Sequence, residues 1–213
     1  VMDILFLIVQ QTMFFSIPLL IVALGGVFTE RSGVTNIALD GIMIMGAFTS
    51  ILFINMMQDK MSGQFLLIIA ILISVITGMI FSLLLAYSAI NMKADQIIGG
   101  TALNMFAPAF AIYAARMIQT NGVQQIAFDN TFRIPSVPIL GDIPIIGDLF
   151  FKNCYITTYI GIGILVISII VLYKTTFGIR LRACGEHPQA ADSVGINVYK
   201  MRYAGVLISG ALA

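Results

Sequence analysis

Five long apolar runs constrain what this chain can fold into more than any other feature of its sequence. Each is close to the roughly 20 residues that cross the hydrocarbon core of a bilayer as a helix. They are continuously apolar and do not alternate with period two, which argues against the strands of a transmembrane barrel. The runs therefore predict membrane-spanning helices over residues 4–24, 42–57, 65–90, 96–117 and 155–173.

A sixth apolar run begins at Tyr203 and reaches Ala213. About eleven residues cannot cross a bilayer, so we expect a fragment of a longer protein. The composition supports the same class, because 59% of the residues are hydrophobic and only 10% are charged, against about a quarter charged in soluble domains. The predicted fold is all-α, a polytopic transmembrane helical bundle of about five spans plus the start of a sixth, in one domain over residues 1–213.

The apolar pattern is interrupted early in the chain. Pro18 lies inside the first run and should kink or break that helix. Backbone groups freed in a broken membrane helix must be satisfied by protein or water. Such a passage follows at residues 25–41, where glycines accompany the polar side chains of Glu30, Arg31, Asn36 and Asp40.

The sequence contains no recognisable set of catalytic residues. His187 is the single histidine, so neither a histidine-paired nucleophile nor a multi-histidine metal site can be built. No GxxxxGK[ST] phosphate-binding loop is present, so no enzyme activity and no cofactor are expected in this chain. Energy for any transport must come from an ion gradient or from a partner. A net charge of +1 gives no reason to expect a nucleic-acid partner.

Residues 177–203 form the longest polar passage between apolar runs. Gly185 should end one element, and Pro188 suits the first turn of a short helix of about two turns. Gly195 stands where a helix C-cap favours glycine, and the next helix can start near Asn197. The passage is either a docking surface for a soluble partner or a solvated turn between spans, and its residues alone leave both open.

The placement of Lys and Arg predicts the orientation. If residues 174–202 are cytoplasmic, seven of the eleven basic residues fall inside and four fall outside. Residues 119–154 then form an extracytoplasmic loop of short extended pieces and turns, and the N-terminus is external. Cys154 and Cys184 fall at opposite ends of one predicted span, which makes a disulfide between them implausible.

The residues from Phe177 to the end, FGIRLRACGEHPQAADSVGINVYKMRYAGVLISGALA, resemble a segment of ABC-importer permeases. The family is the one that holds ribose, simple-sugar, nucleoside and branched-chain amino-acid permeases. Its pattern G-E-x-P-x-A-A-x-x-x-G-I-N-V is the cytoplasmic segment that docks on the ATPase. His187 departs from the asparagine usual before the proline. The resemblance implies that the residues coupled to the ATPase are Gly185, Glu186, Pro188, Ala190, Ala191, Gly195 and Ile196.

Three further stretches resemble the nucleoside and simple-sugar branch of this family. They are GGVFTERSGVTNIALDGIMIMGAF at 25–48, ADQIIGGTALN at 94–104 and VPILGDIPIIGDLFF at 137–151. The resemblance implies the permease subunit of an ATP-driven importer for nucleosides or simple sugars. The alternatives are a permease for ribose-type sugars or branched-chain amino acids, and an ion-driven secondary transporter. The last needs an intramembrane charge relay, and the third, fourth and fifth predicted spans contain no central carboxylate.

The same resemblance implies the partners and the site of transport. The partners are an ABC ATPase that carries ATP and Mg, an extracytoplasmic substrate-binding protein, a second identical or paralogous permease, and the bilayer of the bacterial cytoplasmic membrane. Candidates for the translocation path are Gln11, Asn36, Asp40 and Asn104. The structural alternatives are a Glu30–Arg31 surface turn with Asn36 capping the second helix, and an interhelical hydrogen bond from Asn104.

Overall fold

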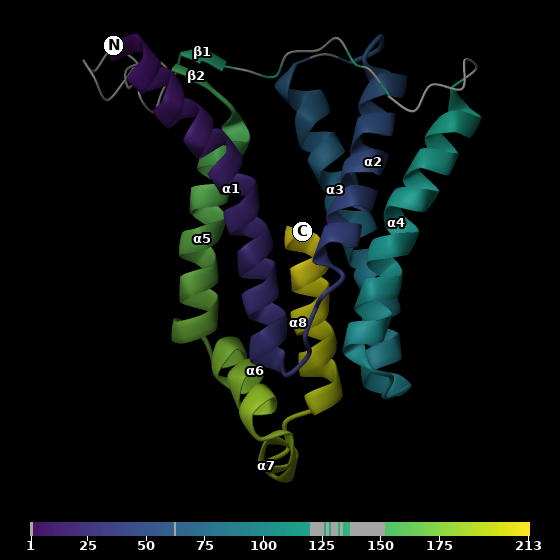
Figure 1. The fold of residues 1–213 in the computed structure, drawn as a ribbon. Helices are drawn as coiled ribbons and strands as arrows, with labels where there is room; N and C mark the ends of the chain where they lie inside the picture. Colours follow the sequence, from purple (N-terminus) through teal and green to yellow (C-terminus); the bar gives the residue numbers. More distant parts are fainter. Residues whose placement is uncertain are drawn as a thin grey trace.

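The computed structural model describes residues 2–61, 63–119, 126, 128, 132, 134–136 and 152–213. Long helices run between two ends of the molecule, with α7 at one end and a two-stranded antiparallel ribbon at the other (Figure 1). The described elements are α1 (Met2–Ser32), α2 (Leu39–Met57), α3 (Gln64–Ala86) with its π-helical continuation η1 (Tyr87–Asn91), α4 (Gln96–Ile118), β1 (Ile134–Ser136), β2 (Lys152–Cys154), α5 (Ile156–Lys174), α6 (Thr176–Glu186), α7 (Pro188–Ser193) and α8 (Val198–Leu212).

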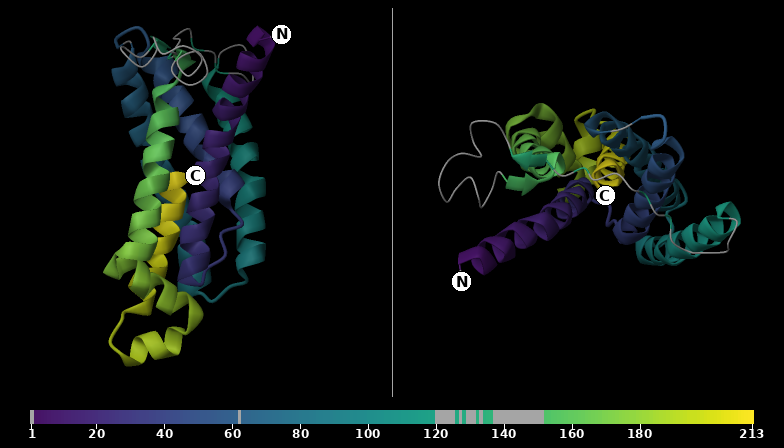
Figure 2. Two further views of the ribbon diagram at one scale, coloured as in Figure 1. Left: turned by 90° about the vertical axis from the view of Figure 1, so that its left-hand side faces the viewer. Right: turned by 90° about the horizontal axis from the view of Figure 1, so that it is seen from above.

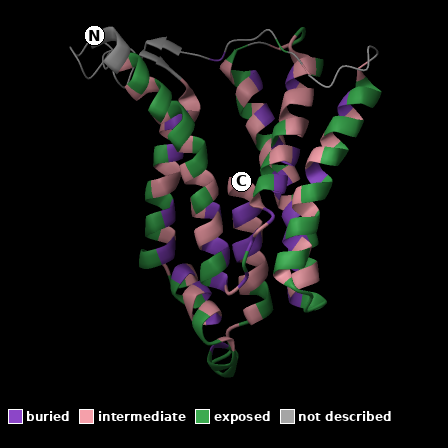
Figure 3. Cartoon of the chain, in the orientation of Figure 1, coloured by how far each residue is buried: buried purple, intermediate pink, exposed green. Residues whose placement is uncertain are grey.

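Five of the described helices are long and apolar enough to cross a membrane: α1, α2, α3 with η1, α4 and α5. This confirms the predicted polytopic helical bundle. The outer faces of these helices are largely exposed (Figure 3). Large apolar side chains lie on them, including Leu19, Ile98 and Met105, each about 70% exposed. Apolar exposure on this scale would be unstable in water and is what a lipid-facing surface requires.

The first helix differs from its prediction. A span ending near residue 24 with a kink or break at Pro18 was expected, but α1 continues through Pro18 and ends at Ser32. A proline in a membrane helix is tolerated where neighbouring groups satisfy the freed backbone. Gly25 also stays helical because α8 packs on it: a Cβ at Gly25 would lie 3.0 Å from the carbonyl oxygen of Ser209.

Helix α8 lies at the centre of the bundle, packed between α1 and α3 (Figures 1 and 2). Small residues make this packing possible. A Cβ at Gly205 would lie 2.7 Å from the Cβ of Ser32 in α1. On its other side, Gly210 packs against Gly78 and Ser82 of α3, where no larger residue would fit. Movement of α8 therefore bears directly on both neighbours.

Candidate functional site

The short helix predicted after Pro188 is present as α7, which projects beyond the ends of the spanning helices (Figure 2). Pro188 occupies its first turn. Gly195 follows it with a φ of +83°, and its N–H donates to the carbonyl of Asp192 at 2.9 Å. The N–H of Ile196 donates to the carbonyl of Ala191 at 3.0 Å. This pair of bonds is a Schellman C-cap, so the predicted role of Gly195 is confirmed.

The next helix also starts where the sequence predicts. Asn197 is the N-cap of α8, and its Oδ1 accepts a hydrogen bond from the N–H of Lys200 at 2.9 Å. On the other side, α6 continues through Gly185 and ends at Glu186. The prediction that Gly185 ends a helix is therefore one residue early, and the reason for a glycine at this position is a close contact.

Gly185 is the point where α6 meets the end of α1. A Cβ at this position would lie 2.5 Å from the carbonyl oxygen of Arg31 and 3.2 Å from the backbone nitrogen of Gly33. Both neighbours are backbone atoms, which cannot move aside as a flexible side chain does. Gly185 thus allows α6 to pack directly against the C-terminal end of α1 and the residue that follows it.

The seven residues expected to couple to an ATPase divide into two groups. Glu186, Ala190 and Gly195 are exposed, as is Val194 beside them with 73% of its side chain accessible. The others are partly or fully inside: Gly185, Pro188 and Ile196 are half-buried, and Ala191 is 3% exposed. Only the first group presents a surface to another protein, and the second holds the segment together.

A second set of predicted residues surrounds the interruption between α1 and α2. The interruption covers residues 33–38, which we call the first break, and is shorter than the predicted 25–41. Gly33 has a φ of +81° and donates to the carbonyl of Glu30 at 3.0 Å, while Val34 donates to that of Thr29 at 3.2 Å. Helix α1 therefore also ends in a Schellman C-cap.

The first break rises from the end of α1 alongside α8 to the start of α2 (Figure 1). Irregular backbone at membrane depth needs partners from protein or water, and α4 supplies them. Asn104 accepts from the N–H of Gly41 and donates to the carbonyl of Ile37, each at 2.7 Å. The Oε1 of Gln96 accepts from the N–H of Thr35 at 2.6 Å.

Asn36 ties the same segment to α8. Its side chain is 7% exposed, and its Oδ1 accepts from the N–H of Ala38 at 3.0 Å. Its Nδ2 donates to the Oγ of Ser209 at 3.0 Å. The predicted cap of the second helix by Asn36 is wrong, because Ala38 is the N-cap residue of α2 and the helix has no side-chain capping hydrogen bond. Ser209 and Gln96 were missed by sequence reasoning, although each is a polar residue at or within an apolar run.

The remaining path candidates lie apart from this cluster. Asp40 is exposed in the first turn of α2. Gln11 is exposed on α1, about 30 Å along the helix from Ser32 at the helical rise of 1.5 Å per residue. Glu30 and Arg31 are exposed in the last turn of α1, so the surface turn proposed for them is wrong.

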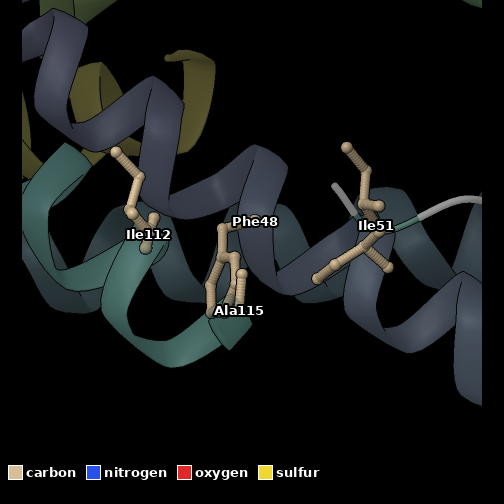
Figure 4. Close-up of a pocket in the computed structure, with 6 residues that line it drawn as sticks. Phe48, Ile51, Ile112 and Ala115 are labelled. Atoms are coloured by element: carbon tan, nitrogen blue, oxygen red, sulfur yellow. The ribbon is translucent and has the colours of Figure 1, made fainter. Parts of the chain in front are cut away.

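Aromatic and apolar side chains of α4 pack on each other and on the neighbouring helices. Phe106 stacks on Phe110 at 5.6 Å and on Phe81 of α3 at 6.2 Å between ring centroids, as interhelical packing would require. An apolar cavity of about 180 Å³ lies between α2 and α4 (Figure 4). It is lined by Phe48, Ile51, Ala111, Ile112, Ala115 and Ile126. The described residues of this lining offer no hydrogen-bonding side chain to a polar solute.

Cys184 is a structural thiol. It is fully buried, and burial raises the pKa of its thiol, an effect that the nearby charge of Arg202 partly opposes. The side chain of Cys154 lies outside the described residues. Among the residues that the structure describes, no group of three or more His, Cys, Asp or Glu side chains could hold a metal ion.

Residues 8–213 match a family described as the permease component of branched-chain amino acid transport systems. The chain belongs to this family. The resemblance carried by its motifs is thereby confirmed, and its five long apolar helices make it a multi-pass membrane protein. No solved structure matches this permease.

Two of the curated relatives that the chain resembles are named for nucleoside transport. The chain is 45% identical to the guanosine ABC transporter permease protein NupQ of Bacillus subtilis, over 99% of this chain and 65% of that protein. It is 41% identical to the nucleoside ABC transporter permease protein NupC of Lactococcus lactis, over 100% of this chain and 66% of that protein. A putative glucose ABC transporter permease protein of Haloferax volcanii is 27% identical, over 92% of this chain and 56% of that protein. The chain thus spans slightly under two thirds of the length of the first two.

Proposed function

We propose that this chain is the membrane-spanning part of a permease subunit that imports nucleosides, driven by ATP hydrolysis on a separate ATPase. The observation that carries the proposal is its 45% and 41% identity, over essentially its full length, to permeases named for guanosine and nucleosides. The relative named for glucose is 27% identical, so sugars are the weaker candidate.

The proposal includes an orientation and partners. Residues 174–202, which contain α6 and α7, face the cytoplasm and bind the ATPase. Residues 119–154 face outward and receive a substrate-binding protein, and a second permease subunit completes the pathway in the bacterial cytoplasmic membrane. The distribution of basic residues supports this orientation.

The contacts support a route from the ATPase to the membrane interior. Glu186, Ala190 and Gly195 are exposed for docking. From there, Gly185 transmits displacement to the end of α1 through its backbone contact with Arg31. Helix α8 provides a second route, through the hydrogen bond between Ser209 and Asn36. Both routes end at the first break, so we assign Asn36 and Asn104 as residues that control the shape of the translocation path.

The coupling part is tested by filling the exposed face of α7. In the whole permease reconstituted with its ATPase and binding protein, Ala190→Leu should lower uptake and substrate-stimulated ATP hydrolysis about tenfold, the effect of about 1.4 kcal/mol of lost coupling. Its melting temperature should not change, because Ala190 is exposed. Ala102→Leu, at an exposed alanine of α4, is the matched control and should leave all three quantities unchanged. Normal coupling in Ala190→Leu would disprove the docking role.

The substrate is tested separately by competition. Uptake of labelled guanosine should be displaced by other nucleosides and not by ribose, galactose or leucine. Displacement by a sugar or by leucine alone would refute nucleoside import while leaving the permease assignment intact. Uptake that persists without ATP but with an ion gradient would instead indicate a secondary transporter.

A further inference from the structure

A polar cavity of about 230 Å³ lies at the α7 end of the bundle, between the end of η1 and the start of α8. Two basic residues from different parts of the chain line it, and none of the described lining residues is acidic. The lining residues are Ala89, Ile90, Lys93, Val198, Tyr199 and Arg202. Two positive charges that share one small cavity repel each other unless a negative charge lies between them.

One donor of Arg202, a lining residue of this cavity, has no hydrogen-bond partner among the described residues. Its Nε is buried and makes no hydrogen bond to any residue that the structure describes. A buried N–H of a charged group without an acceptor is costly, and a guanidinium is suited to bind phosphate through two parallel hydrogen bonds. A guanidinium that lines the cavity next to Lys93 therefore favours an anionic ligand there.

The backbone adds to the positive field. Val198 and Tyr199 are the first two residues of α8, where N–H groups have no acceptor within the helix and the helix dipole favours an anion. The Asn197 side chain caps only the N–H of Lys200. Two side-chain cations and a helix N-terminus thus converge on one cavity.

The position of Lys93 is set by a strained backbone. Lys93 has a φ of +52°, and it is the one non-glycine residue in the described chain with a positive φ. This conformation costs on the order of 1 kcal/mol. The hydroxyl of Tyr203 donates to the Oδ1 of Asn91 at 2.5 Å, which fixes the connection that carries Lys93 against α8. Both features hold the residues that line the cavity in place.

Exposed apolar and aromatic side chains lie on the same segments. Tyr87, Met92 and Tyr199 are 58%, 66% and 57% exposed, and Ile97 and Ile98 follow at the start of α4. Tyrosines and apolar side chains at the end of membrane spans are typical of the lipid interface. Basic pockets between helices at this depth bind lipid head groups. We propose that this cavity binds the phosphate of an anionic phospholipid.

The test measures lipid binding without transport, so it is independent of the proposed function. The whole permease in detergent is mixed with equal amounts of phosphatidylglycerol and phosphatidylcholine with identical acyl chains, and bound lipid is counted by native mass spectrometry. Wild type should retain phosphatidylglycerol preferentially. Lys93→Gly, which also relieves the backbone strain, should reduce that preference about fivefold, as should Arg202→Gln.

Lys200→Gln is the matched control, because Lys200 is exposed in the first turn of α8 and does not line the cavity. It should keep the wild-type preference. An equal loss in Lys200→Gln and Lys93→Gly would show a general surface-charge effect and overturn the proposal. Inorganic phosphate at millimolar concentration should not displace the lipid. If phosphate alone displaces it, the cavity binds a soluble phosphate and the lipid assignment is wrong.

Discussion

Two of the interruptions between described helices share a backbone ending and differ in their surroundings. At the first break, α1 ends in a Schellman cap at Gly33, and at residues 194–197 α7 ends in the same motif at Gly195. The φ angles of the two glycines, +81° and +83°, are nearly equal. A Cβ on Gly33 would lie 3.2 Å from the Cα of Gly185, whereas one on Gly195 would meet no atom within 4 Å.

The difference lies in where the hydrogen bonds come from. Polar groups around the first break are satisfied by side chains 61 to 173 residues away, from Gln96, Asn104 and Ser209. Around α7 the hydrogen bonds are local, such as that from the Ser193 hydroxyl to the carbonyl of Ala190 at 2.8 Å. A segment whose hydrogen bonds are local can face another protein, while a segment bonded to side chains of two other helices, α4 and α8, responds when those helices move.

The largest expected effect comes from removing Asn104. Asn104→Ala would leave the N–H of Gly41 and the carbonyl of Ile37 without partners, which should cost about 2–4 kcal/mol in the free energy of unfolding. Ser193→Ala, at the last residue of α7 next to the other interruption, should cost less than about 0.5 kcal/mol because the residue is exposed. Thermal melting of the purified whole permease measures both. Equal losses would abolish the distinction between the two regions.

A control on α4 distinguishes the loss of the hydrogen bonds to the first break from the loss of any polar side chain on this helix. Thr101 lies on α4 close to Asn104, is exposed, and donates only to the carbonyl of Ile97 in its own helix at 2.7 Å. Thr101→Ala should behave like Ser193→Ala. Uptake should fall in Asn104→Ala and stay unchanged in Thr101→Ala, because only the former loosens the first break.

The next effect compares two glycines within residues 174–202, Gly185 and Gly195. In Gly185→Ala the new Cβ would lie 2.5 Å from the carbonyl oxygen of Arg31, so α6 must shift away from α1, at about 1–3 kcal/mol. Gly195→Ala enters open space and costs only the backbone strain of a positive φ, about 1 kcal/mol. Uptake at equal expression should fall in Gly185→Ala and be largely retained in Gly195→Ala. The opposite order would contradict the transmitting role of Gly185.

Sequence reasoning predicted the local features and missed the distant ones. Pro188, Gly195 and Asn197 fix α7 and its flanks through bonds that span a few residues, so a local pattern was sufficient. The extent of the first break was overestimated because Gly25 and Gly26 read as helix breakers, although α1 continues through them. Their role depends on α8, which lies some 180 residues later in the chain. No local pattern contains that information.

Asn104 shows the same limit at the level of a single residue. A polar residue in an apolar run predicts either a transport role or an interhelical hydrogen bond. The structure shows the hydrogen bonds and places them on the first break, so the interhelical interpretation is confirmed, while the transport role stays a prediction. Ser209 and Gln96 could have been found by the same signal, but their partners could not, because pairing depends on how the helices pack.

The smallest expected effect concerns the start of α7. His187 is its N-cap residue and makes no side-chain capping hydrogen bond, whereas asparagine is among the best N-cap residues. His187→Asn should stabilise α7 by about 0.5–1 kcal/mol, which slows hydrogen exchange of its amides about two- to fivefold if exchange occurs by local opening. His187→Ala has no cap to lose and should exchange as wild type does. If the α7 amides exchange no more slowly in the asparagine variant than in the alanine variant, α7 is not stabilised by its own caps. The first break and α7 would then differ only in their exposure.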